Sequence, residues 1–388
     1  MTYLFNNYGR WDIELVEGKG TKVIDSKGKE FIDFTSGIGV CNLGHCHPHV
    51  VEATTTQFNK IWHTSNLFES SLQEKVAEKL TKYSNGGAVF FCNSGAEANE
   101  AAIKLARKHT GKSKVITFMK SFHGRTFGTM AATGQDKVKV GFGKMLETFV
   151  HLPYNDIDAL EKEIDENTAA VMLEVIQGEG GVNIADPAFL VVVENLCRQH
   201  NVLLIVDEVQ TGIGRTGAPF AYQHYHISPD IITSAKGLGN GFPTGAMIAK
   251  KELYEVFGPG SHGSTFGGNP LAMTAANATL EIAFDNEFLK EVEAKGNYLY
   301  KRLLDELKDV SDLVAIRYKG LMFGLEFTEE IAPLLPILRE QGILALSAGP
   351  NVLRLLPPLT VSIEELDSAI EIIAKTVITN STASSSQK

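Results

Sequence analysis

Short apolar runs that alternate with amphipathic stretches are the feature that most constrains the fold of this 388-residue chain. Apolar runs of this length are typical of strands that are buried on both faces. They are Ala88–Cys92, Val115–Phe118, Ala169–Val175, Leu203–Val206 and Ile231–Thr233. Helical patterns such as Glu97–His109 and Phe189–His200 lie between them. This alternation predicts an α/β fold with a mostly parallel central sheet wrapped by helices.

The two ends of the sequence predict a second, smaller domain. A chain of this length usually exceeds what one hydrophobic core serves. After about Ala283, Phe288–Leu307 reads as an amphipathic helix, and Leu321–Phe327 and Val352–Leu356 read as strands of another sheet. Near the N-terminus, Val23–Asp33 has the pattern of a hairpin. We therefore expect a large domain at 45–283 and a small α+β domain made of 1–44 and 284–378.

The composition predicts a disordered C-terminus and argues against a nucleic-acid-binding, membrane or disulfide-rich protein. Residues 379–388 are rich in Ser and Thr, a composition that predicts a disordered tail. A net charge of −10 without a long Lys/Arg run argues against nucleic acid or an anionic membrane as a partner. No apolar run reaches the roughly 18 residues of a membrane span, and the first twenty residues contain no signal-like apolar core. Four cysteines are too few for a disulfide scaffold, so we expect a cytoplasmic protein.

A phosphate site is one interpretation of the segment that follows Cys92. Asn93-Ser94-Gly95-Ala96 leads from a strand directly into an Ala-rich helix. Free N–H groups and the positive end of the helix dipole meet at such a start and favour an anion. Ser94 can cap the helix and donate a hydrogen bond to a phosphate through its hydroxyl, and Gly95 allows the backbone to approach the phosphate closely. On these residues alone, a capped helix without a ligand is the favoured explanation of the pattern.

Asp207 and Lys236 each follow a buried strand. The apolar run at Leu203 ends in Asp207, at the edge of an α/β sheet where ligands bind. A buried carboxylate needs a cationic partner, either a protonated pyridine nitrogen or an arginine such as Arg215. Lys236 is followed by three glycines within five residues. A desolvated lysine on such a turn suits a Schiff base, and a surface lysine is the competing interpretation.

Taken together, these segments resemble the class III (ω-amino acid) aminotransferases of fold type I, over roughly Tyr8 to Val377. The closest pattern is that of the acetylornithine aminotransferase group. The resemblance rests on motifs in the family order: Gly44–Pro48, His63–Leu67, Asn93–Glu97, Phe122–Thr126, Gln177–Gly181, Asp207–Gly212, Lys236-Gly237 and Ser264–Pro270. One departure is Val175, which stands where relatives usually carry proline. Beside it, Glu174 is expected to be a supporting acid.

The resemblance implies pyridoxal 5'-phosphate as the cofactor and assigns its binding residues. Lys236 would hold it as a Schiff base and shuttle the proton, and Asp207 would keep the pyridine nitrogen protonated. Gln210 would contact the phenolic oxygen, and Phe122 would stack on the ring. Ser94, Gly95 and Ala96 would hold the phosphate. Thr265 would reach the phosphate of the neighbouring subunit, which implies a homodimer with shared active sites.

The resemblance also implies the substrates, N2-acetylornithine and 2-oxoglutarate, in a step of arginine biosynthesis. Arg125 and Arg354 would bind their carboxylates, and Glu179 would pair with Arg354 while the ω-amine donor is bound. Ile38 stands where ornithine aminotransferases carry a tyrosine, and it would tolerate an acylated nitrogen. Ser264 belongs to the same expected substrate site.

Several rival interpretations remain at this point. Ornithine, succinylornithine or 4-aminobutyrate could be the donor, and a racemase, decarboxylase or aminomutase would use the same cofactor. An inactive cofactor-binding regulator is the alternative from another class. The His45-Cys46-His47 cluster could suggest zinc, but adjacent ligands point in alternating directions, so we expect no metal site there.

Overall fold

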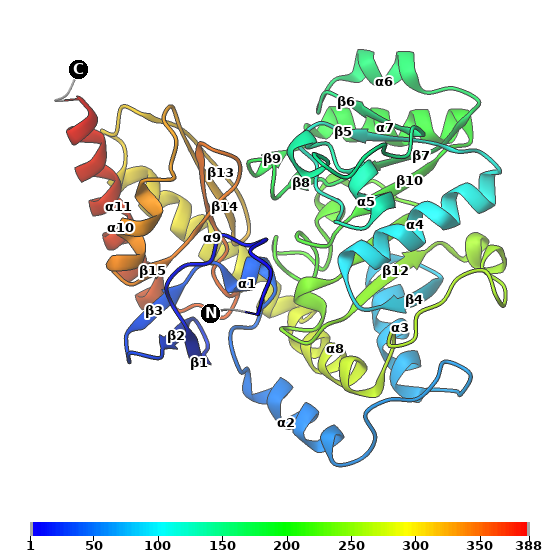
Figure 1. Ribbon diagram of the computed structural model, residues 1–388, viewed down its shortest axis with the longest axis horizontal. Helices are drawn as coiled ribbons and strands as arrows, with labels where there is room; N and C mark the ends of the chain where they lie inside the picture. The colour runs from blue at the N-terminus through cyan, green and yellow to red at the C-terminus, as the bar shows by residue number, and fades with distance from the viewer. Residues whose placement is uncertain (1–2, 386–388) are drawn as a thin grey trace.

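The computed structural model describes residues 3–385, and their side chains as far as Ser381. The larger lobe contains a seven-stranded sheet in the order β4-β12-β11-β10-β7-β5-β6 (Figure 1). Its strands are β4 (Ala88–Cys92), β5 (Lys114–Phe118), β6 (Phe149–Leu152), β7 (Thr168–Leu173), β10 (Leu203–Asp207), β11 (Ile231–Ser234) and β12 (Gly245–Ala249). All strands run parallel except β12, which pairs antiparallel with both of its neighbours. The predicted mostly parallel sheet is therefore confirmed.

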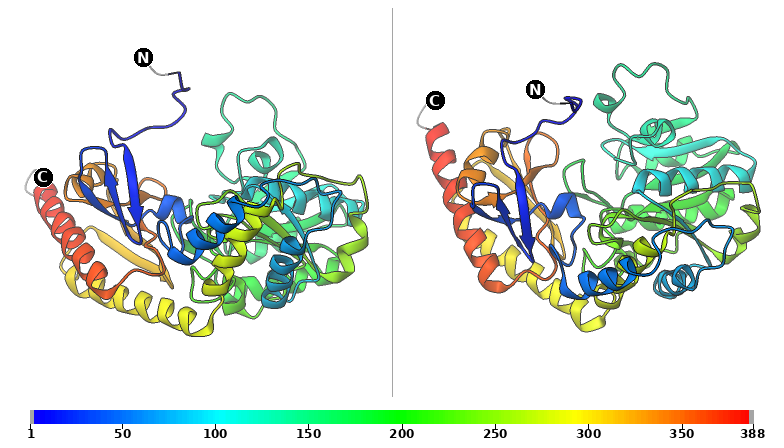
Figure 2. Two further views of the ribbon diagram at one scale, coloured as in Figure 1. Left: turned by 90° about the horizontal axis from the view of Figure 1, so that it is seen from below. Right: turned by 60° about the horizontal axis from the view of Figure 1, so that its bottom comes forward.

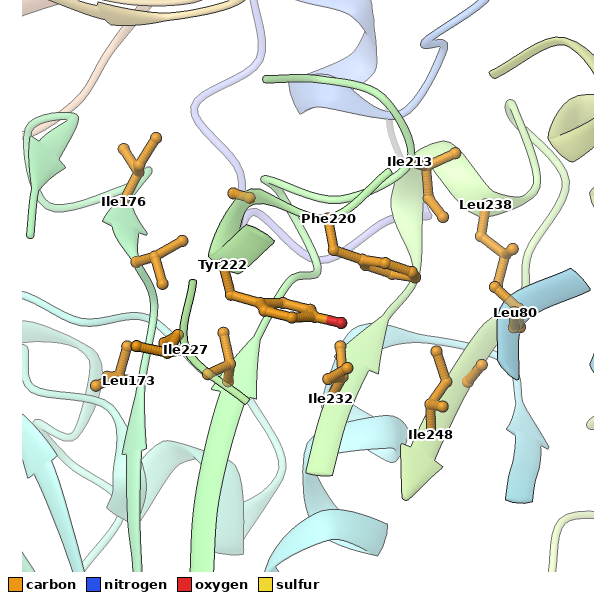
Figure 3. Close-up of a cluster of buried hydrophobic side chains, with 14 of the residues drawn as sticks. Leu80, Leu173, Ile176, Ile213, Phe220, Tyr222, Ile227, Ile232, Leu238 and Ile248 are labelled. Carbon is orange, nitrogen blue, oxygen red and sulfur yellow. The ribbon is translucent and has the colours of Figure 1, made fainter. Parts of the chain in front are cut away.

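Successive side chains of these strands enter two different cores, as strand geometry requires. In β10, Leu204 and Val206 pack on the side of α7, while Ile205 packs against the alanines of α4. Figure 3 shows the first of these cores, where Phe220 and Tyr222 lie beside residues of several strands. The helices of the lobe are α2 (Pro48–Phe58), α3 (Ser71–Ser84), α4 (Gly95–Thr110), α5 (Phe127–Ala132), α6 (Ile157–Glu163), α7 (Pro187–His200) and α8 (Pro270–Ala283). Burial on both faces explains the uninterrupted apolar runs of the sequence.

The smaller lobe joins both ends of the chain (Figures 1 and 2). The hairpin of β2 (Lys22–Asp25) and β3 (Glu30–Asp33) pairs with β15 (Ile343–Leu344), which runs parallel to β3. A second sheet has the order β13-β14-β17-β16, and β17 (Val352–Leu355) carries Arg354. The remaining elements are β1 (Leu15–Lys19), α1 (Ser36–Gly39), β13 (Leu313–Lys319), β14 (Met322–Phe327), β16 (Leu346–Ser347), α9 (Asn286–Glu306), α10 (Leu334–Glu340) and α11 (Ile363–Ser385). The domain boundaries at residues 44 and 283 stay a prediction.

Helix α11 corrects the expectation of a disordered tail. It continues through Ser385, so the prediction is wrong for 379–385, while 386–388 lie outside the described residues. The buried face of the helix, which includes Ile370, Ile373 and Val377, packs in the core of the small lobe. Its last described turns extend that anchored helix, and Asn380 donates a hydrogen bond back to Thr376 O. Within residues 3–385, no helix is long and apolar enough to cross a membrane.

Candidate active site

Parallel strands bring the predicted residues together at one edge of the large sheet. The edge borders a cavity of about 430 Å³, which is in the size range of small-molecule sites. Strands β4, β7, β10 and β11 all end there, because parallel strands place their carboxyl ends at the same edge. Nine predicted site residues line it: Ser94, Gly95, Ala96, Phe122, Arg125, Glu179, Asp207, Gln210 and Lys236.

The start of α4 forms one wall of the cavity. Ser94 adopts an extended conformation as the N-cap, and its Oγ accepts a hydrogen bond from Glu97 N at 3.2 Å. The N–H groups of the first turn have no partner within a helix, so they are available to an anion. Gly95 is required by packing, since a Cβ there would lie 2.7 Å from Cγ1 of Val209.

Asp207 is held by two side chains that the sequence did not single out. Its Oδ2 accepts hydrogen bonds from Asn99 Nδ2 and His123 Nδ1, each at 2.8 Å, and its Oδ1 accepts one from Val209 N. Thr233 in turn donates to Asn99 Oδ1 at 2.6 Å, which orients the amide. Burial lowers the pKa of His123, but the hydrogen bond and charge of Asp207 outweigh it and raise that pKa. The partner of Asp207 is therefore this histidine, and Arg215 lies elsewhere.

Lys236 enters the cavity from a strained turn after β11. Its φ is +42°, a conformation that residues with a Cβ rarely adopt. Burial lowers the pKa of its amine, and the charge of Arg354 lowers it further against the opposing effect of Glu179. A lysine with a lowered pKa is closer to the neutral form that attacks a carbonyl carbon.

Arg354 and Glu179 form the ion pair that the resemblance implied. Nη1 of Arg354 donates to Glu179 Oε1 at 2.6 Å, to Gly178 O at 2.9 Å and to Gln210 Oε1 at 3.1 Å. Gln210 also donates to Glu179 Oε1 at 3.2 Å. Burial opposes ionisation of Glu179, but the neighbouring arginine keeps the pKa of this carboxyl below its usual value. Glu179 and Gln210, which Arg354 contacts, line the cavity, whereas Arg354 itself does not.

Glu174 follows β7 and ties two parts of the cavity wall together. Its Oε1 accepts a hydrogen bond from Phe122 N at 2.9 Å, and its Oε2 accepts one from Gly178 N at 3.3 Å. Burial raises the pKa of this carboxyl to about 7. Glu174 thus supports the loop of the expected ring-stacking residue and the loop of Glu179, and it also lines the cavity. The neighbouring Val175 is fully buried in the core.

The other expected residues lie outside the cavity. Thr265 is exposed in a separate groove beside Asn93 and Glu97. Ser264 accepts hydrogen bonds from Asn93 Nδ2 at 3.1 Å and from Gly267 N. Ile38 is 45 % exposed, two residues before Val40, which does line the cavity. Its φ of +68° is unusual for a β-branched side chain.

The cavity suits pyridoxal phosphate in the chemistry of its donors. It combines a helix N-terminus for a phosphate, a carboxylate for a ring nitrogen, and an amine for an aldehyde. The buried Thr244 hydroxyl, on a residue that lines the cavity, has no hydrogen-bond partner among the described residues. A buried polar atom of this kind indicates a missing partner. The residues that could hold the cofactor are therefore Ser94–Ala96, Phe122, Asp207, Gln210 and Lys236.

A family model and curated relatives match nearly the whole chain. The family model described as aminotransferase class-III matches residues 4–377. An acetylornithine aminotransferase of Bacillus cereus is 60% identical over 97% of this chain and 98% of its own length. The acetylornithine aminotransferase of Bacillus subtilis is 58% identical over 95% of this chain and 96% of its own length.

Solved structures agree in fold. An ornithine aminotransferase from Toxoplasma gondii, with partial occupancy of PLP at its active site, aligns with a TM-score of 0.93 and 34% identity. The alignment covers 97% of this chain and 92% of that one. The N-acetylornithine aminotransferase of Stenotrophomonas maltophilia aligns with a TM-score of 0.85 and 38% identity, over 97% of this chain and 98% of that one.

Proposed function

Because the chain belongs to the class-III aminotransferase family, we propose that it transfers the terminal amino group of N2-acetylornithine to 2-oxoglutarate. The products are N-acetylglutamate 5-semialdehyde and glutamate, in arginine biosynthesis. The chain is a pyridoxal-phosphate-dependent enzyme, as its family and relatives are. The observation that carries the proposal is the ion pair between buried Arg354 and partly exposed Glu179 beside Lys236, because it can serve two unlike substrates at one site. The names of the relatives favour acetylornithine as the donor.

Pyridoxal phosphate, when bound, accepts the amino group and withdraws electrons from the carbon that loses a proton. Lys236 would hold the aldehyde of the cofactor through Nζ, and the same amine would carry the proton. The Asp207 carboxylate would favour a proton on the pyridine nitrogen, and Asn99 and His123 hold that carboxylate in place. Phe122 would cover the ring, and the first turn of α4 would bind the phosphate.

Two arginines allow the proposed site to accept two different substrates. Arg125 is exposed at the cavity, with its guanidinium 5.6 Å from the centroid of the Phe122 ring, and binds the α-carboxylate of the donor. Arg354 stays paired with Glu179 during that step, so its charge is masked. With 2-oxoglutarate, Glu179 moves away and the guanidinium binds the α-carboxylate through two parallel hydrogen bonds. Arg125 then binds the distal carboxylate.

Ile38 supports an acylated donor in preference to ornithine, because its side chain offers no acceptor for a free ammonium group. It does not discriminate against 4-aminobutyrate, which has no such group. The test is to compare the catalytic efficiency for acetylornithine, succinylornithine, ornithine and 4-aminobutyrate with 2-oxoglutarate as acceptor. The highest efficiency for 4-aminobutyrate would overturn the proposed donor.

Hydride trapping tests the cofactor attachment directly. After borohydride reduction of the loaded enzyme, we expect mass spectrometry to place the phosphopyridoxyl adduct on Lys236. Lys236→Ala should lack the adduct, while Lys250→Ala, which alters a lysine paired with Asp230, should retain it. An adduct on another lysine in the wild-type protein would contradict the assignment.

A homodimer with shared sites is part of the same proposal. Thr265 lies outside the cavity of its own chain, on a segment whose backbone accepts hydrogen bonds from Asn66. Large apolar side chains are exposed around it: Trp62 at 60%, Leu67 at 92%, Phe68 at 69% and Phe266 at 61%. Clustered apolar exposure of this kind is typical of a protein interface. Sedimentation should give a dimer, and a monomeric active enzyme would contradict the shared sites.

The cytoplasmic location stays a prediction.

A further inference from the structure

Arg215 is a fully buried cation that hydrogen-bonds only to neutral groups among the described residues. Its Nη1 donates to Leu321 O at 3.0 Å and to Pro357 O at 2.5 Å, and its Nη2 donates to Asn42 Oδ1 at 2.8 Å. Burial lowers the pKa of the guanidinium to about 9. A buried charge without a carboxylate partner is costly to retain. Such a group calls for an explanation beyond stability.

The three acceptors belong to segments far apart in the sequence. Arg215 lies in the loop that follows β10 and carries Gln210, and Leu321 immediately precedes β14 of the small lobe. Pro357 is three residues beyond Arg354, just after the end of β17. The backbone is joined here too, since Leu321 N donates to Arg215 O at 3.0 Å.

Asn42 extends the same network to the turn of Lys236. Its Nδ2 donates to Ile213 O at 2.8 Å, and its backbone O accepts from Leu359 N at 2.7 Å. It also packs directly on Gly237, where an added Cβ would lie 2.3 Å from Asn42 Nδ2. Asn42 therefore touches both the residue that follows Lys236 and the segment that follows Arg354.

We propose that Arg215 and Asn42 are positioning residues that fix Arg354 of the small lobe relative to Lys236 of the large lobe. The inference rests on the proposed function, because it concerns the carboxylate of 2-oxoglutarate. A carboxylate on Arg354 and a carbonyl carbon at the cofactor must be held at a set separation, and small errors in such a separation are costly in rate. The rigid guanidinium spans three acceptors at once, which the single ammonium of a lysine on a flexible stem cannot reproduce.

The experiment compares Arg215→Lys, Asn42→Ala and the double variant in the fully loaded enzyme. Both single variants should raise the KM for 2-oxoglutarate and the dissociation constant of glutarate by about tenfold, the effect of one charge-assisted hydrogen bond. The rate of the first half-reaction with acetylornithine should stay within about twofold, because that step uses Arg125. The double variant should be no worse than the poorer single variant, since residues that act together are not additive.

Arg302→Lys is the matched control, because this arginine pairs with Asp367 on the small lobe away from the cavity. A lowered Tm with unchanged glutarate binding, or an equal loss in both half-reactions, would show that Arg215 is only structural. If Arg215→Lys does not fold, Asn42→Ser decides the matter with the same measurements. If the wild-type enzyme cannot use 2-oxoglutarate, the proposed function is overturned, and the positioning role falls with it.

Discussion

Replacing Arg354 with lysine should slow the half-reaction with 2-oxoglutarate far more than the half-reaction with the amino donor. Nη1 of Arg354 donates to three acceptors, and the side chain is only 2% exposed. A lysine keeps the charge but loses the planar fork that binds a carboxylate through two bonds. The loss of one charge-assisted hydrogen bond costs about 1.5–3 kcal/mol. That corresponds to a decrease of roughly tenfold to 150-fold in kcat/KM for 2-oxoglutarate.

The donor half-reaction should change little, because Arg354 is masked by Glu179 during that step. Single-turnover spectra of the loaded enzyme measure the two half-reactions separately, one with acetylornithine and one with 2-oxoglutarate. Arg302→Lys provides the control for an arginine-to-lysine change in the same lobe. Equal slowing of both half-reactions would refute the proposal that Arg125 binds the donor carboxylate and Arg354 binds the α-carboxylate of 2-oxoglutarate.

Three further predictions concern other parts of the site and the fold. Asp207→Asn should lower the transamination rate by about a hundredfold or more, because a neutral amide cannot keep a pyridine nitrogen protonated. A near-normal rate would contradict its role. Thr265→Ala should weaken cofactor binding, measured by titration of the unloaded protein, and equal affinity would argue against a shared site. The Asp33 carboxylate raises the pKa of His45 to about 10 against the effect of burial. The stabilisation by protonated His45 should therefore be complete below the ordinary pKa of about 6.5 and be lost as pH rises toward 10. Unfolding free energies of wild type and His45→Gln should converge over that range, by at most about 1.4 kcal/mol per pH unit, and a constant gap would contradict the linkage.

The strand ends of the site could be predicted from the sequence because local composition encodes them. The runs that end at Cys92, Val206 and Thr233 are apolar on both faces, which is the pattern of a central parallel strand. Strand β4 has the predicted bounds, and β10 and β11 each extend one residue further. Parallel strands then place Ser94, Asp207 and Lys236 near one edge without further information.

The partners of Asp207 could not be predicted in the same way. His123 is 84 residues away in sequence, and Asn99 lies in an Ala-rich helix where a polar residue is unremarkable. Their contacts depend on the crossing of α4 over β10 and on the loop after β5, which are tertiary features. The antiparallel strand β12 was also missed, since Gly245–Ala249 contains only one β-branched residue, Ile248, beside a glycine and two alanines that disfavour a strand. The helical conformation of residues 379–385 could not be predicted from their own composition, because the buried residues in the earlier turns of helix α11 stabilise that helix.

The exposure of the two partners in the Arg354–Glu179 pair indicates which of them moves. The Glu179 side chain is 29% exposed, whereas that of Arg354 is 2% exposed and also bound to Gly178 O. A charge that leaves a pair needs either a new partner or water, because a buried unpaired charge is strongly unfavourable. Glu179 can reach water, and Arg354 cannot. We therefore expect an incoming carboxylate to replace Glu179 on a stationary arginine, so that the proposed network around Arg215 keeps Arg354 in place for both substrates.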